Sequence, residues 1–183
     1  MLSIPSNGNS LQTFEISKGT AEIAVTFPMT IEVNMRNGTA AVYRGPLLYA
    51  LPIDYSNKTY HQPLNFTDQK PLPDDQVHSH THDWVLPATS QWKYAIDPST
   101  LEAQSSEIGD VDLKNPIWAS DGPPTTISVD AYPIEWNDDG GQPSDPPVKA
   151  NVTGTARKVK LVPYGAAKLH IAEFPIVNST QLR

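Results

Sequence analysis

Three histidines at a spacing of two residues are the clearest candidates for chemistry. They are His78, His80 and His82, and Asp83 follows them directly. In an extended strand every second side chain points to the same face, about 6 to 7 Å from the next. Imidazole and carboxylate groups are ligands of zinc and copper. One hypothesis is therefore a zinc or copper site, with His170 as a distant ligand. The alternative, a solvated histidine-rich loop, needs no cofactor, and we expect none.

Aromatic side chains offer a second kind of site, because an amphipathic ring can pack on the apolar face of a sugar. Trp84 and Trp136 flank loop-like stretches, so we expect them to form an exposed carbohydrate-binding platform. Trp92, Tyr43 and Tyr49 lie inside strand-like patterns, where we expect core packing. The same residue types therefore predict a binding surface in one context and a hydrophobic core in the other.

Carboxylates are abundant, and a glycosidase would need two of them at a defined separation. The candidates are Glu102, Glu107, Asp110, Asp112, Asp121, Glu135, Asp138 and Asp139. Most lie in polar stretches, where carboxylates are normally hydrated. We expect no catalytic pair and no enzymatic activity from this chain alone. Glu173, close to Lys168 and His170 in sequence, is expected to form a structural ion pair.

The cellular compartment is indicated by five Asn-X-Thr or Asn-X-Ser sequences, which are N-glycan acceptors in a secretory lumen. They begin at Asn37, Asn57, Asn65, Asn151 and Asn178. We therefore expect a secreted, extracellular glycoprotein. The first five residues lack the basic segment and apolar core of a signal peptide, so we expect residue 1 to be a truncation point.

Composition excludes several classes of protein. The 183 residues contain no cysteine, which excludes disulfides, thiolate metal ligands and a cysteine nucleophile. A net charge of -7 argues against a nucleic-acid partner, which requires clustered cations. No apolar run approaches the roughly 20 residues of a membrane-spanning helix. A mean hydropathy of -0.39 is typical of a globular domain.

The elements that must position these residues are strands, because apolar residues recur with a period of two. The expected strands cover residues 11–16, 21–27, 30–35, 92–96, 115–119, 125–131, 158–162 and 168–174. Residues 39–51 are more continuously apolar, and Gly45-Pro46 predicts a bulge or kink within one buried strand. Arg44, beside this interruption, is expected to be a structural anchor held by a carboxylate or carbonyl group.

These patterns predict an all-β fold, an antiparallel β-sandwich of jelly-roll-like form. Residues 1–53 and 151–183 are expected to form the main sandwich. Residues 54–150 are expected to be a loop-rich insertion with a few strands, and a second small sandwich inserted into the first is the alternative. Residues 52–91 and 137–147 are rich in loop and turn residues.

Three segments together resemble the C-terminal region of the fungal β-L-arabinofuranosidase-type glycoside hydrolases. They are AVYRGPLLYAL (41–51), WKYAIDPSTL (92–101) and LVPYGAAKLH (161–170). The structural residues expected within them are Arg44, Gly45, Pro46, Pro163, Tyr164 and Gly165. The resemblance implies β-sandwich modules that follow a helical toroid. In that family a glutamate and cysteine-bound zinc lie on the toroid, so no residue here inherits a catalytic role.

Three functions follow as hypotheses. The first is a non-catalytic accessory module that supports the helical-toroid catalytic domain of a secreted carbohydrate-active enzyme, or its oligomer. The second is a lectin-like module that binds plant or fungal glycans, which predicts exposed tryptophan. The third is a small metal-dependent hydrolase that uses His78, His80 and His82, which predicts bound metal.

Overall fold

The computed structural model describes residues 18–19, 29–56, 59–78, 80, 83–105, 115–118, 122–139 and 142–177. The strands expected over residues 11–16 and 21–27 lie outside the described residues. His82 and the glycan acceptors Asn57 and Asn178 also lie outside them.

The described residues confirm an all-β chain. The strands are β1 (Ile31–Arg36), β2 (Thr39–Arg44), β3 (Leu47–Pro52), β4 (Thr59–His61), β5 (Asp83–Val85), β6 (Tyr94–Ile96), β7 (Glu102–Ser105), β8 (Thr125–Pro133), β9 (Asp138–Asp139), β10 (Gln142–Pro143), β11 (Arg157–Pro163), β12 (His170–Ile171) and β13 (Phe174–Pro175). Short 3-10 turns lie at η1 (Asp74–Gln76), η2 (Pro98–Thr100) and η3 (Tyr164–Ala166). Within these residues no helix has the length and apolar character needed to cross a bilayer.

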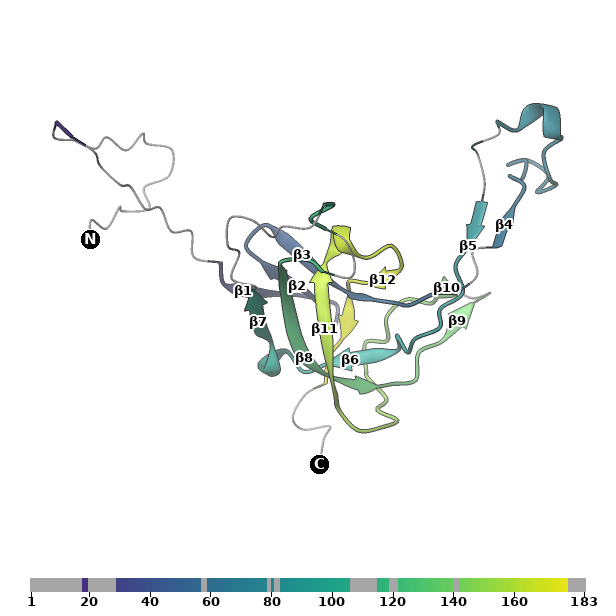
Figure 1. The fold of residues 1–183 in the computed structure, drawn as a ribbon. Helices are drawn as coiled ribbons and strands as arrows, with labels where there is room; N and C mark the ends of the chain where they lie inside the picture. Colours follow the sequence, from purple (N-terminus) through teal and green to yellow (C-terminus); the bar gives the residue numbers. More distant parts are fainter. Residues whose placement is uncertain are drawn as a thin grey trace.

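One antiparallel sheet dominates the fold, and it curls back on itself (Figure 1). Its strand order is β1-β2-β3-β11-β8-β6, with β12 beside β3, β13 beside β2 and β7 beside β8. One edge of β2 is fully paired with β1, and the other is shared between β3 and β13. The segment after β13 then reaches β6 through the Ile176–Ile96 bridge, and Val177 N donates to Ile96 O at 2.9 Å. β2 and β6 are thereby linked through β13 and the residues after it, around a common interior.

Two tight turns connect the first three strands. Asn37 and Gly38 have φ values of 48° and 84°, as a type I′ turn requires, and link β1 to β2. Gly45 has a φ of 54° and precedes a proline, whose φ is fixed near −65°, so this turn has the type II′ pattern. Arg44 therefore pairs with Leu47 across the turn. The expectation of one kinked strand over residues 39–51 was wrong, because Gly45-Pro46 reverses the chain.

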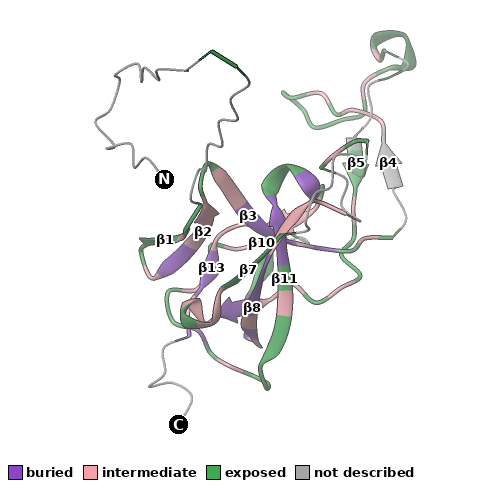
Figure 2. Ribbon diagram, turned by 60° about the vertical axis from the view of Figure 1, so that its left-hand side comes forward, coloured by how far each residue is buried: buried purple, intermediate pink, exposed green. Residues whose placement is uncertain are grey.

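The interior is filled by alternate residues of the joined strands, as the period-two pattern predicts. It consists of Ala40, Val42, Tyr49, Leu51, Tyr94, Ile96, Ile127, Val129, Ala131, Leu161 and Phe174. Figure 2 shows this burial along the central strands and its absence in the projecting part of the chain. The core thus draws on residues from 40 to 174, and every strand of the closed ring contributes to it.

The expected insertion at residues 54–150 requires correction. β6, β7 and β8 all lie in that range, yet β8 pairs with β11 over five residue pairs and stands in the middle of the main sheet. Its residues Ile127 and Val129 are fully buried in the shared core. The main sheet therefore includes strands from both sides of the predicted boundaries, and the described residues contain no second sandwich.

A two-stranded arm, residues 54–90, projects from this sheet (Figure 1). Its base is closed by Thr89 N, which donates to Asp54 O at 2.7 Å, and its stem is the antiparallel pair β4–β5. An isolated bridge between Leu64 and Pro71 continues the pairing toward the tip. The structure thus replaces the expected long loop over residues 52–91 with a paired projection. None of its residues is buried among those whose burial is described, residues 54–56, 62–78, 80 and 84–90.

Three further expectations differ in detail. Residues 115–118 form a bend and turn rather than a strand. The strand expected over residues 168–174 is divided into β12 and β13, because these pieces pair with different strands, β3 and β2. The turn-rich stretch over residues 137–147 contains the short hairpin β9–β10.

Candidate functional site

Aromatic and cationic side chains gather where the arm leaves the sheet. Trp84 lies on β5 of the arm, and its side chain faces the loop between η3 and β12. Lys168 lies in that loop, Tyr164 is the first residue of η3, and His170 is the first residue of β12. We call these four residues the aromatic patch. It joins two segments about 80 positions apart in the chain.

The contacts within the aromatic patch are specific. The Nζ atom of Lys168 lies over the Trp84 ring, 5.9 Å from its centroid, which is within the range of a cation–π interaction. The rings of Tyr164 and His170 meet edge to face, with centroids 4.2 Å apart and an interplanar angle of 70°. Trp84 and Tyr164 are each 49% exposed, so both rings keep surface that a ligand can contact.

The local fold explains why Tyr164 faces outward. Pro163 precedes η3, and Ala166 and Ala167 are buried together with Val162 beneath it. Because this short turn presents its alanines to the sheet, Tyr164 and Gly165 are left on the solvent side. The Nδ1 atom of His170 lies 2.8 Å from the Ala167 carbonyl oxygen, which fixes the orientation of the imidazole. Tyr164, expected to be a structural residue, is therefore half accessible.

Trp136 does not belong to an exposed platform, so this expectation was wrong. It is only 5% exposed and packs edge to face against Trp92, with ring centroids 5.4 Å apart. Its indole Nε1 donates to the carbonyl oxygen of Ser144 at 2.9 Å, which satisfies the one polar atom of the side chain. Both rings belong to a second small cluster on the outside of β6, together with Ile134 and Ala150.

Arg44 contacts three other segments of the chain, mainly through hydroxyl groups rather than the expected carboxylate or carbonyl group. Its Nη1 donates to Ser105 Oγ at 2.8 Å and to Thr125 Oγ1 at 2.7 Å, and its Nε donates to Met29 O at 3.4 Å. Tyr49 OH also lies 2.9 Å from Thr125 Oγ1. The guanidinium thereby ties the β2–β3 turn to the neighbouring ends of β7 and β8.

The histidine run is described only in part. His78 and His80 are exposed, their ring centroids lie 5.4 Å apart, and His80 N donates to His78 Nδ1 at 3.3 Å. Among the described residues no group of three His, Asp or Glu side chains is placed to hold a metal ion. His82 falls outside those residues, so the three-histidine site stays a hypothesis.

Several of the described carboxylates have structural partners, whereas Glu107, Asp110, Asp112 and Asp121 lie outside the described residues. Glu102 and Asp130 lie 3.6 Å and 3.8 Å from Lys158 Nζ, and Asp138 lies 2.8 Å from Lys93 Nζ. Glu173 Oε1 accepts a hydrogen bond from Thr39 Oγ1 at 2.5 Å, in place of the expected ion pair. Exposed pairs of this kind contribute little stability each, about 0–1 kcal/mol.

Three of the expected glycan acceptors can be placed. Asn37 is exposed at the tip of the β1–β2 turn. The Oδ1 of Asn65 accepts from Thr67 N at 2.8 Å, which forms an Asx-turn near the arm tip. Asn151 is exposed, and its Nδ2 donates to Glu135 Oε2. All three therefore lie at or near the surface, where a glycan can be accommodated.

Comparison with protein-family models, with curated proteins and with solved structures finds no match for this chain. The resemblance to β-L-arabinofuranosidase-type enzymes accordingly remains an expectation from three segments. What can be argued about function comes from the surface of the molecule.

Proposed function

We propose that this chain is a non-catalytic β-sandwich module that binds carbohydrate, as an accessory part of a secreted carbohydrate-active enzyme. The observation that supports this proposal is the half-exposed indole of Trp84, placed beside a lysine at the arm base. Among the three hypotheses from the sequence, an exposed tryptophan is the feature that favours the lectin-like one.

The aromatic patch has the chemistry that sugar recognition needs. An indole packs against the C–H face of a sugar ring, while neighbouring polar groups contact its hydroxyls. Lys168 offers an ammonium donor, and Tyr164 offers a phenolic hydroxyl that can donate or accept. A sugar that contacts the exposed part of Trp84 would therefore find hydrogen-bonding groups on the adjoining loop.

The test is a binding screen with soluble plant and fungal oligosaccharides, arabino-oligosaccharides included, followed by calorimetry and tryptophan fluorescence. Aromatic contacts contribute about 0.5–1.5 kcal/mol beyond area burial, so we expect Trp84→Ala to weaken binding about tenfold. The matched control is Trp118→Ala, since Trp118 is 38% exposed but lies outside the aromatic patch. Equal losses in both variants, or no saturable binding by the unaltered chain, would contradict the proposal.

A second candidate function is the support of a catalytic domain through docking, and the arm tip favours it. Phe66 is 95% exposed and Leu64 is 47% exposed, so two large apolar side chains stand in water at the end of the arm. The backbone there is ordered by hydrogen bonds, including Gln69 N to Asn65 O at 2.9 Å. An ordered projection that carries an unburied phenylalanine suits insertion into an apolar groove on a partner.

This docking function can be tested with the helical-toroid domain of a β-L-arabinofuranosidase-type enzyme supplied as a separate chain. We expect a complex on size-exclusion chromatography that Phe66→Ser abolishes. Met35→Ser is the control, because Met35 is 51% exposed on β1 and does not belong to the arm. Absence of a complex, or equal sensitivity to both changes, would contradict docking through the arm.

A further inference from the structure

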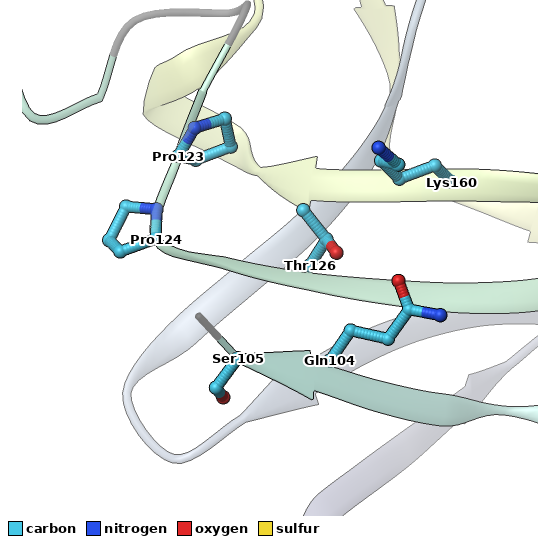
Figure 3. A pocket seen from close by; sticks show the side chains of 6 residues that line it. All are labelled: Gln104, Ser105, Pro123, Pro124, Thr126 and Lys160. Atoms are coloured by element: carbon cyan, nitrogen blue, oxygen red, sulfur yellow. The ribbon is translucent and has the colours of Figure 1, made fainter. Parts of the chain in front are cut away.

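A polar hollow lies on the outer face of the sheet, where β7, β8 and β11 run side by side (Figure 3). Its volume is about 230 Å³, and it is lined by Gln104, Ser105, Pro123, Pro124, Thr126 and Lys160. The residues that alternate with Thr126 and Lys160 along the strands, Ile127 and Leu161, are fully buried. The strand pleat therefore directs Thr126 and Lys160 outward, to the hollow.

Lys160 differs from the lysine two positions before it on the same strand. Lys158 Nζ lies within 4 Å of both Glu102 and Asp130, so its charge is balanced. Within the described part of the chain, Lys160 forms no ion pair, and the side chains of Gln104 and Thr126 form no hydrogen bond. Three polar side chains around one hollow are thus available to a ligand.

The groups that line the hollow are mostly donors. Lys160 supplies an ammonium, Gln104 an amide NH₂, and Ser105 and Thr126 supply hydroxyls. Because Ser105 Oγ already accepts from Arg44 Nη1 at 2.8 Å, its own proton is left to donate. Among the residues that the structure describes, the lining includes no carboxylate. One cation together with several donors suits a singly charged oxyanion, to which charge-assisted hydrogen bonds are the strong ones.

The remaining wall of the hollow is apolar. Pro123 and Pro124 stand side by side at its rim, and both are partly exposed (Figure 3). Proline rings offer a rigid C–H surface on which the face of a sugar ring can lie. At about 230 Å³ the hollow is smaller than the sites of drug-sized ligands, which are about 300–1,000 Å³, and it suits a single ring.

We infer that this hollow binds an acidic sugar, a hexuronate residue whose carboxylate pairs with Lys160 and whose ring lies against Pro123 and Pro124. The ligand class rests on the proposed carbohydrate-binding function, but the site is separate from the aromatic patch. Since the whole chain carries a net charge of -7, an anion is attracted only where a local cation such as Lys160 is unbalanced.

The test is calorimetric titration of the full chain with sodium galacturonate and with galactose, which lacks the carboxylate. We expect galacturonate to bind at least tenfold more tightly than galactose. Lys160→Met should remove this preference, whereas Lys158→Met should change galacturonate affinity by less than twofold. Trp84→Ala should also leave galacturonate affinity unchanged. Backbone amide shifts of Gln104 and Thr126 on titration would place the ligand in the hollow.

Other outcomes separate the two proposals. Equal losses from Lys160→Met and Lys158→Met would mean that net charge alone matters, and would overturn the inference. Acetate binding as tightly as galacturonate would overturn the sugar part of it. Neutral glycans that bind through Trp84 without any galacturonate preference would overturn the inference while the proposed function stands. Galacturonate binding that depends on Lys160, with no glycan binding at Trp84, would support the hollow as a binding site. It would contradict the proposal that the aromatic patch binds glycans.

Discussion

The curled sheet and the arm are two regions of one chain that are stabilised in opposite ways. The sheet buries Tyr49, Ile96 and Phe174 almost completely, and its strands are joined from β2 around to β13. The arm has no buried residue among those whose burial is described, and its stem is held by a few backbone pairs. Its large apolar side chains, such as Phe66, lie in water instead.

We expect the sheet to determine the stability of the chain and the arm to contact ligands or partners. Burial of apolar side chains is the main favourable term in folding, so residues of the sheet are expected to determine the free energy of unfolding. Residues of the arm contribute little to it, and they remain available for contact with ligands or partners. Phe66 in the arm and Phe174 in the sheet show the difference for one residue type, because the first is exposed and the second is buried.

The largest effect is expected from Phe174→Ala, compared with Phe66→Ala. Phe174 is 1% exposed in β13, so its truncation should lower the free energy of unfolding by about 3–5 kcal/mol. Phe66 is 95% exposed, and its truncation should change that free energy by less than about 0.5 kcal/mol. Urea denaturation followed by circular dichroism measures both values. Comparable losses would show that the arm tip is buried in solution.

The next effect concerns two glycines. Gly38 has a φ of 84°, and a Cβ there would lie 2.8 Å from Val148 Cγ1 and 3.1 Å from Val148 O. Gly38→Ala should therefore cost about 1–3 kcal/mol of unfolding free energy through backbone strain and crowding.

Gly165 is the control for this change, because a Cβ there meets no atom within 4 Å and its φ is not in the left-handed region. Gly165→Ala should leave stability within about 0.5 kcal/mol. The structure therefore gives no reason for a glycine at this position, although a structural role was expected. A large loss from Gly165→Ala would reveal a constraint that the described contacts do not contain.

A smaller effect is expected from Tyr49→Phe. The ring of Tyr49 is fully buried, and its hydroxyl lies 2.9 Å from Thr125 Oγ1 in the Arg44 network. Removal of the hydroxyl should cost about 1 kcal/mol, measured by thermal or urea unfolding. Tyr164→Phe should be nearly neutral for stability, because Tyr164 is half exposed. A larger loss from Tyr164→Phe than from Tyr49→Phe would show that the Tyr164 hydroxyl has the structural role predicted from the sequence.

The smallest effect on stability is expected from removal of the arm. Asp54 and Thr89 are hydrogen-bonded neighbours, so residues 55–88 can be replaced by a short Gly-Ser linker. The unfolding free energy of the sheet should change by less than about 1 kcal/mol, since loop length affects closure entropy only weakly. Glycan binding through Trp84 should be lost at the same time. A drop as large as that from Phe174→Ala would contradict the separation of the two regions.

Much of the sheet could be predicted because its central strands β2, β3, β8 and β11 each contain buried apolar residues. The alternation in residues 30–35, 125–131 and 158–162 corresponds to β1, β8 and β11. The turns were harder to predict, because the same pair of residues can indicate a modification site or a tight turn. Asn37-Gly38 begins a glycan acceptor sequence, and the same two residues form the type I′ turn between β1 and β2.

The candidate site was predicted only in part, since exposure depends on contacts between distant segments. Trp84 and Trp136 have similar loop-like neighbours in the sequence, but Trp136 meets Trp92 and the Ser144 carbonyl. No local pattern indicates that contact. The position of Lys160 beside a hollow could not be predicted from the sequence either. It depends on the pairing of β11 with β8 and of β8 with β7.

The closure of the sheet by β13 has a consequence for how the chain folds. Thr39 and Glu173, which are hydrogen-bonded at this closure, are separated by 134 positions in the sequence. Pairing over such distances raises the contact order, and proteins of high contact order fold slowly. During synthesis β2 emerges long before the strand that covers part of its edge. We therefore expect nascent chains that stop short of residue 174 to leave this edge unpaired and to require protection from aggregation, whereas release of residues 174–177 should trigger the final step of folding.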